Sequence, residues 1–245
     1  VLIVFGWLSG CNFRLAGKDW GVVFLLSLLR AVTSFSLIIA YQNIASGVAS
    51  TIHFMYPLAV SLAMMFFFHE KKSLLVMLAV LMSLFGAALL SSGELEAKSG
   101  NTMVGLVAAC VSVFSYAGYI VGVRTTRVVQ INSTALTCYV MGLGTIFYLI
   151  GAYCTSGLQL VSDGYTWLII LGLALPATAI SNITLVQAIK YAGPTLTSIL
   201  GAMEPLTAVV IGVFVFKELF TVNSAVGIIL ILLAVSIVVF RRQKS

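Results

Sequence analysis

The sequence predicts an all-α polytopic membrane protein built from two inverted helical repeats. Three observations indicate this fold. First, 61% of the 245 residues are hydrophobic and only 8% are charged, whereas soluble domains carry about 25% charged residues. Second, the chain contains a series of apolar runs, and a spanning helix needs about 20 such residues. Third, the segment at residues 50–70 recurs in altered form at residues 198–218.

The apolar runs predict eight complete membrane-spanning helices and one partial helix. The partial run covers residues 1–11, and because it is too short to cross a bilayer, we expect further residues to precede Val1. The links between runs are too short to hold an extramembrane domain. The complete spans are expected at residues 20–42, 46–68, 73–92, 102–123, 133–154, 165–190, 194–216 and 222–240.

Lysine and arginine are distributed unequally among the links. When alternate links are assigned to opposite sides of the membrane, ten basic residues fall on one side and only Lys98 and Lys217 on the other. Basic residues concentrate in cytoplasmic loops. We therefore expect a multi-pass membrane protein with a cytoplasmic C-terminus. Its net charge of +6 then reflects topology, and we expect no nucleic-acid partner.

The recurring segment indicates an internal duplication. In both copies a proline lies inside an apolar run, and a glutamate ends the run thirteen residues later. An odd number of spans separates the copies, so they are predicted to cross the membrane in opposite directions, as in many secondary transporters. Seven positions are identical at an offset of 148 residues: Ser50/Ser198, Met55/Met203, Pro57/Pro205, Leu58/Leu206, Phe66/Phe214, Phe68/Phe216 and Glu70/Glu218.

The motifs of both copies are similar to those of EamA-type transporters, a family of the drug/metabolite transporter (DMT) superfamily. The resemblance covers nearly the whole chain and implies ten helices in two inverted five-helix repeats. It assigns residues 1–98 to an N-terminal repeat that lacks its start and residues 99–245 to an inverted C-terminal repeat. It also implies export of amino acids or other small metabolites across a bacterial inner membrane. The motifs are Ala40-Tyr41, Tyr56-Pro57-Leu58, Glu70 and Gly86, then Gly193-Pro194, Glu204-Pro205-Leu206, Lys217-Glu218 and Gly227.

Three ionisable residues fall inside predicted spans, where charge is costly and marks either function or a structural ion pair. They are Arg30, His53 and Glu204. One interpretation places all three on a central substrate cavity. An equally weighted alternative is an ion pair between Arg30 and Glu204 that locks the two halves together. For His53, a buried histidine bonded to a helix backbone is the alternative.

Polar stripes at helical spacing support the cavity interpretation, because a polar stripe in lipid must face protein or water. Hydrogen bonds between serines and threonines of neighbouring helices are the alternative for the smaller side chains. Three mid-span prolines each remove a backbone donor, and we expect a hinge or a kink at Pro57, Pro176 and Pro205. The remaining predicted substrate-binding residues are Tyr41, Tyr56, Tyr116, Tyr119 and Asn182.

These observations predict a secondary transporter that works by alternating access on a small-molecule substrate. Arg30 would bind a carboxylate, Glu204 would bind an ammonium group or exchange a proton, and a proton or substrate gradient would supply the energy. The alternatives are a carrier of drugs, nucleotide sugars or phosphate esters and, from another class, a membrane receptor or enzyme. The sequence holds no P-loop, dinucleotide or zinc-protease motif, so we expect no enzyme activity, cofactor or metal.

Overall fold

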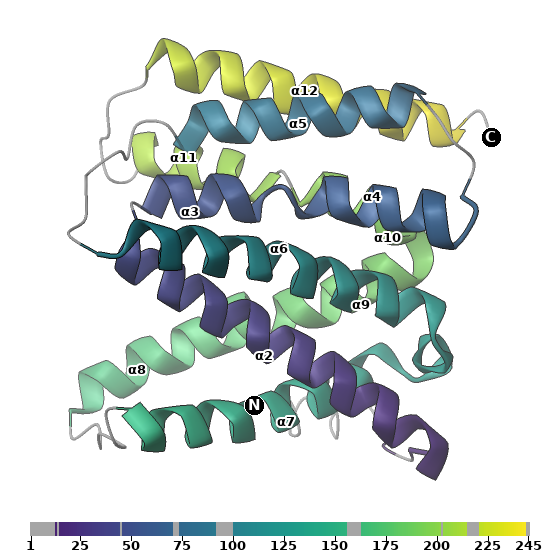
Figure 1. Ribbon diagram of the computed structural model, residues 1–245, viewed down its shortest axis with the longest axis vertical. Coiled ribbons are helices and arrows are strands. Elements are labelled where there is room, and N and C mark those ends of the chain that lie inside the picture. The colour runs from purple at the N-terminus through teal and green to yellow at the C-terminus, as the bar shows by residue number, and fades with distance from the viewer. Residues whose placement is uncertain are drawn as a thin grey trace. The chain divides into compact units, whose positions relative to one another are not determined.

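The computed structural model describes residues 13, 15–44, 46–70, 74–91, 100–155, 163–201, 203–214 and 221–243. All secondary structure in these ranges is helical (Figure 1). Two apolar helical stretches, Leu74–Gly86 and Ala225–Ile237, are shorter than a membrane span. The partial run predicted at residues 1–11 lies outside the described residues. Five described stretches are long and apolar enough to cross a membrane: Gly17–Asn43, Val48–Phe67, Thr102–Thr125, Ser133–Gly151 and Gly164–Ala192.

The eight predicted complete spans are confirmed as helical, but three of them are interrupted. The uninterrupted helices are α2 (Trp20–Asn43), α5 (Leu74–Ser91), α6 (Thr102–Thr125), α7 (Ser133–Thr155) and α12 (Val222–Gln243). Two interrupted spans are α3 (Ser46–His53) with α4 (Tyr56–Phe67), and α10 (Pro194–Leu200) with α11 (Met203–Phe214). The third is α8 (Gly164–Gly172) with α9 (Ser181–Ala192), and a π-helical segment, Leu173–Ile180, joins these two helices. A short 3-10 helix, η1 (Gly17–Asp19), precedes α2. Another, η3 (Arg127–Gln130), follows α6.

Side-chain caps fix where several helices begin, because the first amides of a helix have no partner within it. The Asn101 side chain accepts hydrogen bonds from the amides of Met103 and Val104 at the start of α6. Asp163 accepts one from the amide of Thr166 at the start of α8. These caps set the ends of spans whose apolar interiors give no such signal.

The chain divides into two compact units, each drawn from both predicted repeats. One unit combines Val1–Ala31 with Gly122–Gly193, and the other combines Val32–Val121 with Pro194–Ser245. Helices α2 and α6 each contribute to both units. The predicted boundary between the repeats, at residues 98 and 99, lies outside the described residues, so that boundary stays a prediction.

Aromatic contacts anchor the first unit at the beginning of α2. The Tyr139 ring of α7 packs edge-on against Trp20 at a centroid distance of 5.5 Å and against Phe13 at 6.5 Å. Farther along, Phe24 meets Phe147 at 5.6 Å. Edge-to-face pairs of this kind contribute about 0.5–1.5 kcal/mol each beyond the apolar area that they bury. They join α2 to α7 over more than one helical turn.

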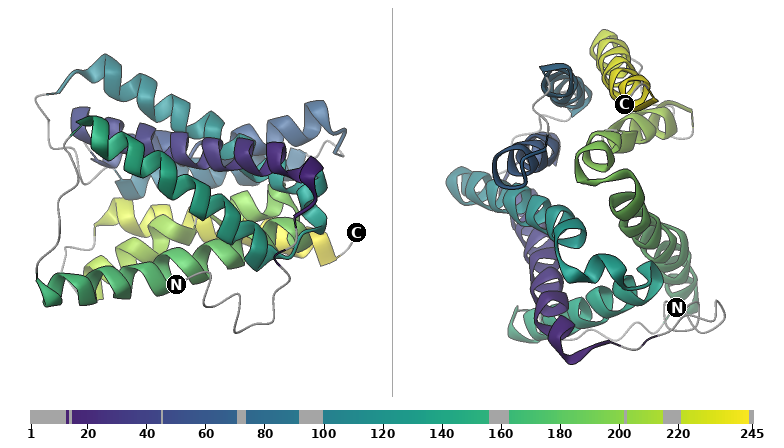
Figure 2. Two further views of the ribbon diagram at one scale, coloured as in Figure 1. Left: turned by 90° about the horizontal axis from the view of Figure 1, so that it is seen from below. Right: turned by 90° about the vertical axis from the view of Figure 1, so that its right-hand side faces the viewer.

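Helices α5 and α12 form the closest pair of the second unit and run antiparallel (Figures 1 and 2). A Cβ atom added to Gly86 would lie 2.8 Å from the carbonyl oxygen of Gly227, so the two backbones approach at a glycine. Small residues permit such close contact between membrane helices. Ala79 and Ala234 share one core cluster farther along the same pair.

The positions that meet in this helix pair correspond at the repeat offset. At 148 residues Gly86 is equivalent to Ala234, and Ala79 is equivalent to Gly227. Gly86 and Gly227 approach one another, and Ala79 and Ala234 belong to one core cluster. An inverted duplication with a two-fold axis between the helices would produce this correspondence. The inverted repeat itself stays a prediction.

Several serine and threonine hydroxyls inside the described helices bond to a carbonyl of their own helix. Ser27 donates to Val23 and Thr137 to Ser133, four residues back in each case. This arrangement satisfies the hydroxyl within one segment, as a lipid environment demands. Hydroxyl bonds within a helix were not among the expected roles of these residues, whereas an expected bond between helices is found at Thr33.

Candidate functional site

His53 lies at the centre of an aromatic cluster at the end of α3. Its ring centroid is 5.6 Å from that of Tyr56 and 5.4 Å from that of Tyr116. The two tyrosines meet edge-on at 4.7 Å, and Tyr119 stacks parallel to Tyr116 at 6.3 Å. Tyr56, Tyr116 and Tyr119 are buried, whereas His53 is partly buried. Four predicted site residues therefore come together around one imidazole.

The interruption between α3 and α4 positions this cluster. Phe54 and Met55 form a turn, and Pro57 follows in the first turn of α4. Proline has no backbone N–H and cannot continue the hydrogen-bond ladder of the preceding helix. The break separates His53, at the end of α3, from Tyr56, at the start of α4. Figure 1 shows the two helices following one another with this break between them.

Two hydroxyls of α6 connect the cluster to neighbouring helices. Nδ1 of His53 lies 3.0 Å from Oγ of Ser112. Ser112 in turn donates to the carbonyl oxygen of Ala109 at 2.6 Å. One helical turn along, the Ser115 hydroxyl shares a 2.9 Å hydrogen bond with Thr33 of α2. The polar stripe predicted on residues 102–123 thus contacts α3 on one side and α2 on the other.

The second interrupted span meets the first at Tyr56. A Cβ atom on Gly201, just after α10, would lie 1.7 Å from the Tyr56 hydroxyl oxygen, so the tyrosine occupies the space that any side chain at 201 would need. The Gly201 carbonyl oxygen accepts a 3.0 Å hydrogen bond from the amide of Glu204. Glu204 is exposed on the first turn of α11. Sequence reasoning missed Gly201, although it lies at the repeat position equivalent to His53.

In the other compact unit, Arg30 donates from Nη2 to Oδ1 of Asn182 at 3.2 Å. Asn182 is only 6% exposed, and its Nδ2 donates to the carbonyl oxygen of Thr178 at 2.7 Å. Thr178 belongs to the π-helical segment that contains Pro176. A π-helical segment places carbonyl groups out of the regular ladder. The segment thereby orients the amide so that its oxygen faces the guanidinium group.

The last predicted site residue, Tyr41, lies on α2 outside the aromatic cluster. It is 36% exposed, and its hydroxyl shares a 3.2 Å hydrogen bond with Ser50 of α3. The structure therefore brings four of the eight predicted residues into one cluster and pairs two others, Arg30 and Asn182. A single cavity lined by all eight stays a prediction.

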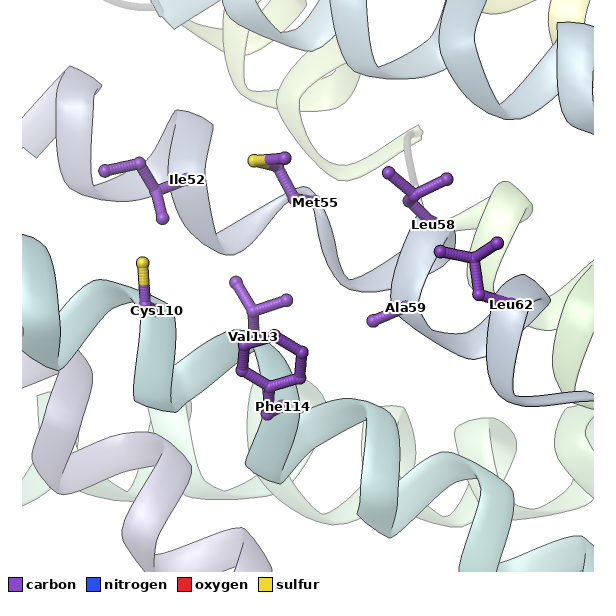
Figure 3. Close-up of a pocket in the computed structure, with 8 residues that line it drawn as sticks. All are labelled: Ile52, Met55, Leu58, Ala59, Leu62, Cys110, Val113 and Phe114. Carbon is purple, nitrogen blue, oxygen red and sulfur yellow. The ribbon is translucent and has the colours of Figure 1, made fainter. Parts of the chain in front are cut away.

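An apolar groove of about 200 Å³ lies between α3 and α4 on one side and α6 on the other (Figure 3). The α6 residues that line the groove alternate with Ser112 and Ser115, which face the polar contacts. No predicted site residue lines it. The lining residues are Ile52, Met55, Leu58, Ala59, Leu62, Cys110, Val113 and Phe114.

Lys190 of α9 has a structural contact at the helix end. It is 8% exposed, and its Nζ donates to the carbonyl oxygen of Ile131. Arg124, in the last turn of α6, donates to the carbonyl oxygen of Lys190 itself at 2.7 Å. These two cations therefore satisfy carbonyl groups where α6, η3 and α9 meet.

Three comparisons relate this chain to known proteins. The family model described as "EamA-like transporter family" matches residues 103–240. A curated protein of Archaeoglobus fulgidus described as "Uncharacterized transporter" is 27% identical over 96% of this chain and 83% of its own length. A crystal structure titled only as that of a protein superposes with a TM-score of 0.80 at 18% identity, covering 96% of this chain and 81% of the other. At that identity the structural match concerns the fold alone.

Proposed function

Because the chain belongs to the EamA-like transporter family and is a multi-pass membrane protein, we propose that it is a secondary active transporter that exports small metabolites, amino acids or similar compounds, by alternating access. The family and the archaeal relative support transport as the general function. The charge asymmetry of the loops supports a cytoplasmic C-terminus in a plasma membrane, which for a bacterial host is the inner membrane.

The observation that carries this proposal is the imidazole of His53 among three tyrosines in spanning helices. Ionisable groups within a bilayer are costly and mark pathways for substrates or protons. Tyrosine rings offer apolar faces together with hydroxyl groups, which suits small amphipathic solutes. Tyr56, Tyr116 and Tyr119 are the residues to which we assign contact with the less polar part of the substrate.

Alternating access is supported by the symmetric contact of α5 and α12. Two copies of one unit laid in opposite directions have nearly equivalent inward-open and outward-open arrangements, which is how many transporters are built. The break at residues 54–55 and the break that begins at Gly201 lie within two positions of one another at the repeat offset. We propose that both breaks act as hinges, since interrupted backbone is tolerated where it lines a cavity.

Arg30 is proposed to bind an anionic group such as a substrate carboxylate. The Asn182 oxygen accepts a hydrogen bond from Nη2 and orients the guanidinium. A planar guanidinium presents its donors in a rigid fork that matches the two oxygens of a carboxylate. This assignment concerns the first compact unit and is tested on its own. If Arg30→Lys transports normally, bidentate carboxylate binding at this position is refuted.

The phosphate-ester alternative is less well supported. A carrier of nucleotide sugars would need several cations to neutralise phosphate groups. Besides Arg30, the sequence offers only Lys190, near the end of a span. The ammonium group of Lys190 donates to the Ile131 carbonyl. Sparse charge therefore favours a zwitterionic or amphipathic substrate over a phosphate ester.

The test begins with a thermal-shift screen of the purified full-length protein against amino acids, nucleotide sugars and cationic drugs. A ligand that binds only the folded state raises its apparent stability by mass action. The ligand found is then tested for counterflow in proteoliposomes. If no small molecule of any of these classes is both bound and transported, the proposed function is wrong.

Matched variants locate the site once a ligand is known. Tyr116→Ala removes a ring of the cluster, and Tyr153→Ala removes an exposed ring of α7 outside it. We expect the affinity for the ligand to fall about tenfold in the first variant, because an aromatic contact contributes about 0.5–1.5 kcal/mol beyond its buried area. Equal affinities in the two variants would refute the assignment of the aromatic cluster to the substrate.

A further inference from the structure

We infer that His53 and Glu204 form a proton-binding pair at the meeting point of the two helix breaks, with Nε2 of His53 as the atom that takes up the proton. The contacts run continuously between them. His53 packs against Tyr56, the Tyr56 hydroxyl lies against Gly201, and the Gly201 carbonyl accepts from the amide of Glu204. All four residues belong to the same compact unit.

The hydrogen bonds of Ser112 determine the tautomer of His53. A serine hydroxyl has a single proton, and the 2.6 Å contact with the Ala109 carbonyl uses it, because a carbonyl oxygen can only accept. In the 3.0 Å contact with His53, the Ser112 oxygen is therefore the acceptor and Nδ1–H is the donor. The neutral ring then carries its lone pair on Nε2, and protonation takes place there.

The repeat symmetry gives a second argument from the same contact. At the 148-residue offset Tyr56 is equivalent to Glu204, and Gly201 is equivalent to His53. The observed approach of Tyr56 to Gly201 therefore implies an approach of Glu204 to His53 on the other side of the axis. A glutamate reaches less far than a tyrosine, but a histidine ring extends where glycine has no side chain. The two pairs are thus complementary in size.

The energetics of the bilayer favour such a pair. A lone carboxylate in a membrane span is costly, and intramembrane ionisable groups pair with one another. A neutral imidazole beside the Glu204 carboxylate has a net charge of −1. When a proton from the aqueous phase binds the Nε2 lone pair, the ring becomes an imidazolium whose new N–H donates to the carboxylate, and the pair becomes neutral. One proton is thereby bound per pair.

The other titratable groups around the imidazole are tyrosines. Tyr56 of α4 and Tyr116 of α6 face the ring directly, and Tyr41 of α2 hydrogen-bonds to another residue of α3. Cys110 of α6 lines the apolar groove instead (Figure 3). Helices α5 and α10 carry no titratable side chain, and α11 contributes the carboxylate itself. The pair is therefore the acid–base centre of this neighbourhood among the described residues.

The experiment uses solid-state NMR of the full chain in lipid bilayers, with ¹⁵N-labelled histidine and glutamate labelled with ¹³C at the carboxyl carbon. The chain contains two histidines, and His69 adopts a positive φ of 54°, which asparagine tolerates. His69→Asn therefore leaves His53 as the single ring signal. We expect protonated Nδ1, an unprotonated Nε2 at high pH, and dipolar coupling between Nε2 and a glutamate carboxyl carbon.

Two matched variants identify the partner and the positioning residue. Glu204→Gln removes the labelled carboxyl, so the coupling is expected to disappear, whereas Glu70→Gln, which alters a carboxylate bonded to Thr195, should leave it unchanged. Ser112→Ala should give a mixture of His53 tautomers, and Ser112→Thr should restore the single Nδ1–H form. Coupling that survives in Glu204→Gln, or a His53 ring protonated only on Nε2, would overturn the inference.

The role of the pair in coupling proton movement to transport rests on the proposed transport function. The existence of the His53–Glu204 pair does not. Counterflow measured on the same preparations separates the two. Transport without the dipolar coupling refutes the pair alone. The coupling without transport of any screened compound refutes the proposed function alone. If both hold, loss of proton movement in Glu204→Gln supports the coupling role, and unchanged proton movement overturns it.

Discussion

Gly86 offers the sharpest test of the packing between α5 and α12. Replacing it with alanine would put a Cβ atom 2.8 Å from the Gly227 carbonyl oxygen and 2.8 Å from a side-chain carbon of Ile231. The first of these atoms belongs to the backbone of a helix and cannot rotate away as a flexible side chain would. The two helices must therefore separate or shift.

The magnitude follows from two opposing effects. Overpacking a tight contact costs about 1–3 kcal/mol, whereas alanine gains about 0.8–1 kcal/mol over glycine in a helix interior. The net destabilisation is then between about 0 and 2 kcal/mol. At roughly 2–4 °C per kcal/mol for a chain of this size, the melting temperature should fall by up to about 8 °C.

Gly142 provides the matched control. It lies inside α7, and a Cβ atom there would have no heavy atom within 4 Å. Gly142→Ala should keep only the helical gain and raise the melting temperature by about 1–4 °C. Both variants are measured by circular dichroism in nanodiscs at one lipid composition. The same sign of change in both variants would refute the reasoning that α5 and α12 meet backbone to backbone.

Three further predictions concern local contacts. Gly201→Ala should displace the Tyr56 ring, whose hydroxyl lies 1.7 Å from the added carbon, and so lower the melting temperature; Tyr56→Phe in the same protein should recover part of the loss. Asn101→Ala should cost about 0.5–2 kcal/mol in denaturant unfolding because the α6 cap is lost, and Asn101→Asp should cost less. Hydrogen bonds from Thr166 hold the pKa of Asp163 below its ordinary value of 3.8, and the bond from the backbone amide has a larger effect than the bond from the hydroxyl. The stabilisation by Asp163 should therefore be complete above that value and lost as pH falls through the lowered pKa; an unchanged acid limb of the melting curve in Asp163→Asn would contradict this.

Much of the fold could be predicted because its signals are local. The span 20–42 was expected from apolarity alone, and α2 covers Trp20–Asn43. The bilayer imposes both the length and the apolarity of each span, so the sequence carries them at every position. The positions of the breaks were less predictable. Pro57 and Pro205 suggested them, but the turn lies at Phe54 and Met55, where no residue signals it.

The candidate site was predictable in its residue types and less so in its contacts. His53 and Tyr116 were selected because polar groups in spans are costly, and the structure places their rings 5.4 Å apart. The partner of Arg30 was expected to be Glu204 or a substrate, whereas the structure adds Asn182. The hydrogen bond from Lys190 to the Ile131 carbonyl could not be read from spacing.

The sequence by itself determined that the chain is a helical membrane protein and where its spans lie, and it predicts that two segments are copies of one another. Only the tertiary structure decided which side chains meet: Ser112 with His53, Gly201 with Tyr56, and Gly86 with the backbone of α12. The physical reason is that span length and apolarity are properties of one segment in its solvent. Contacts between segments depend on the rotation and axial shift of each helix, which are set by close packing with neighbours distant in the sequence.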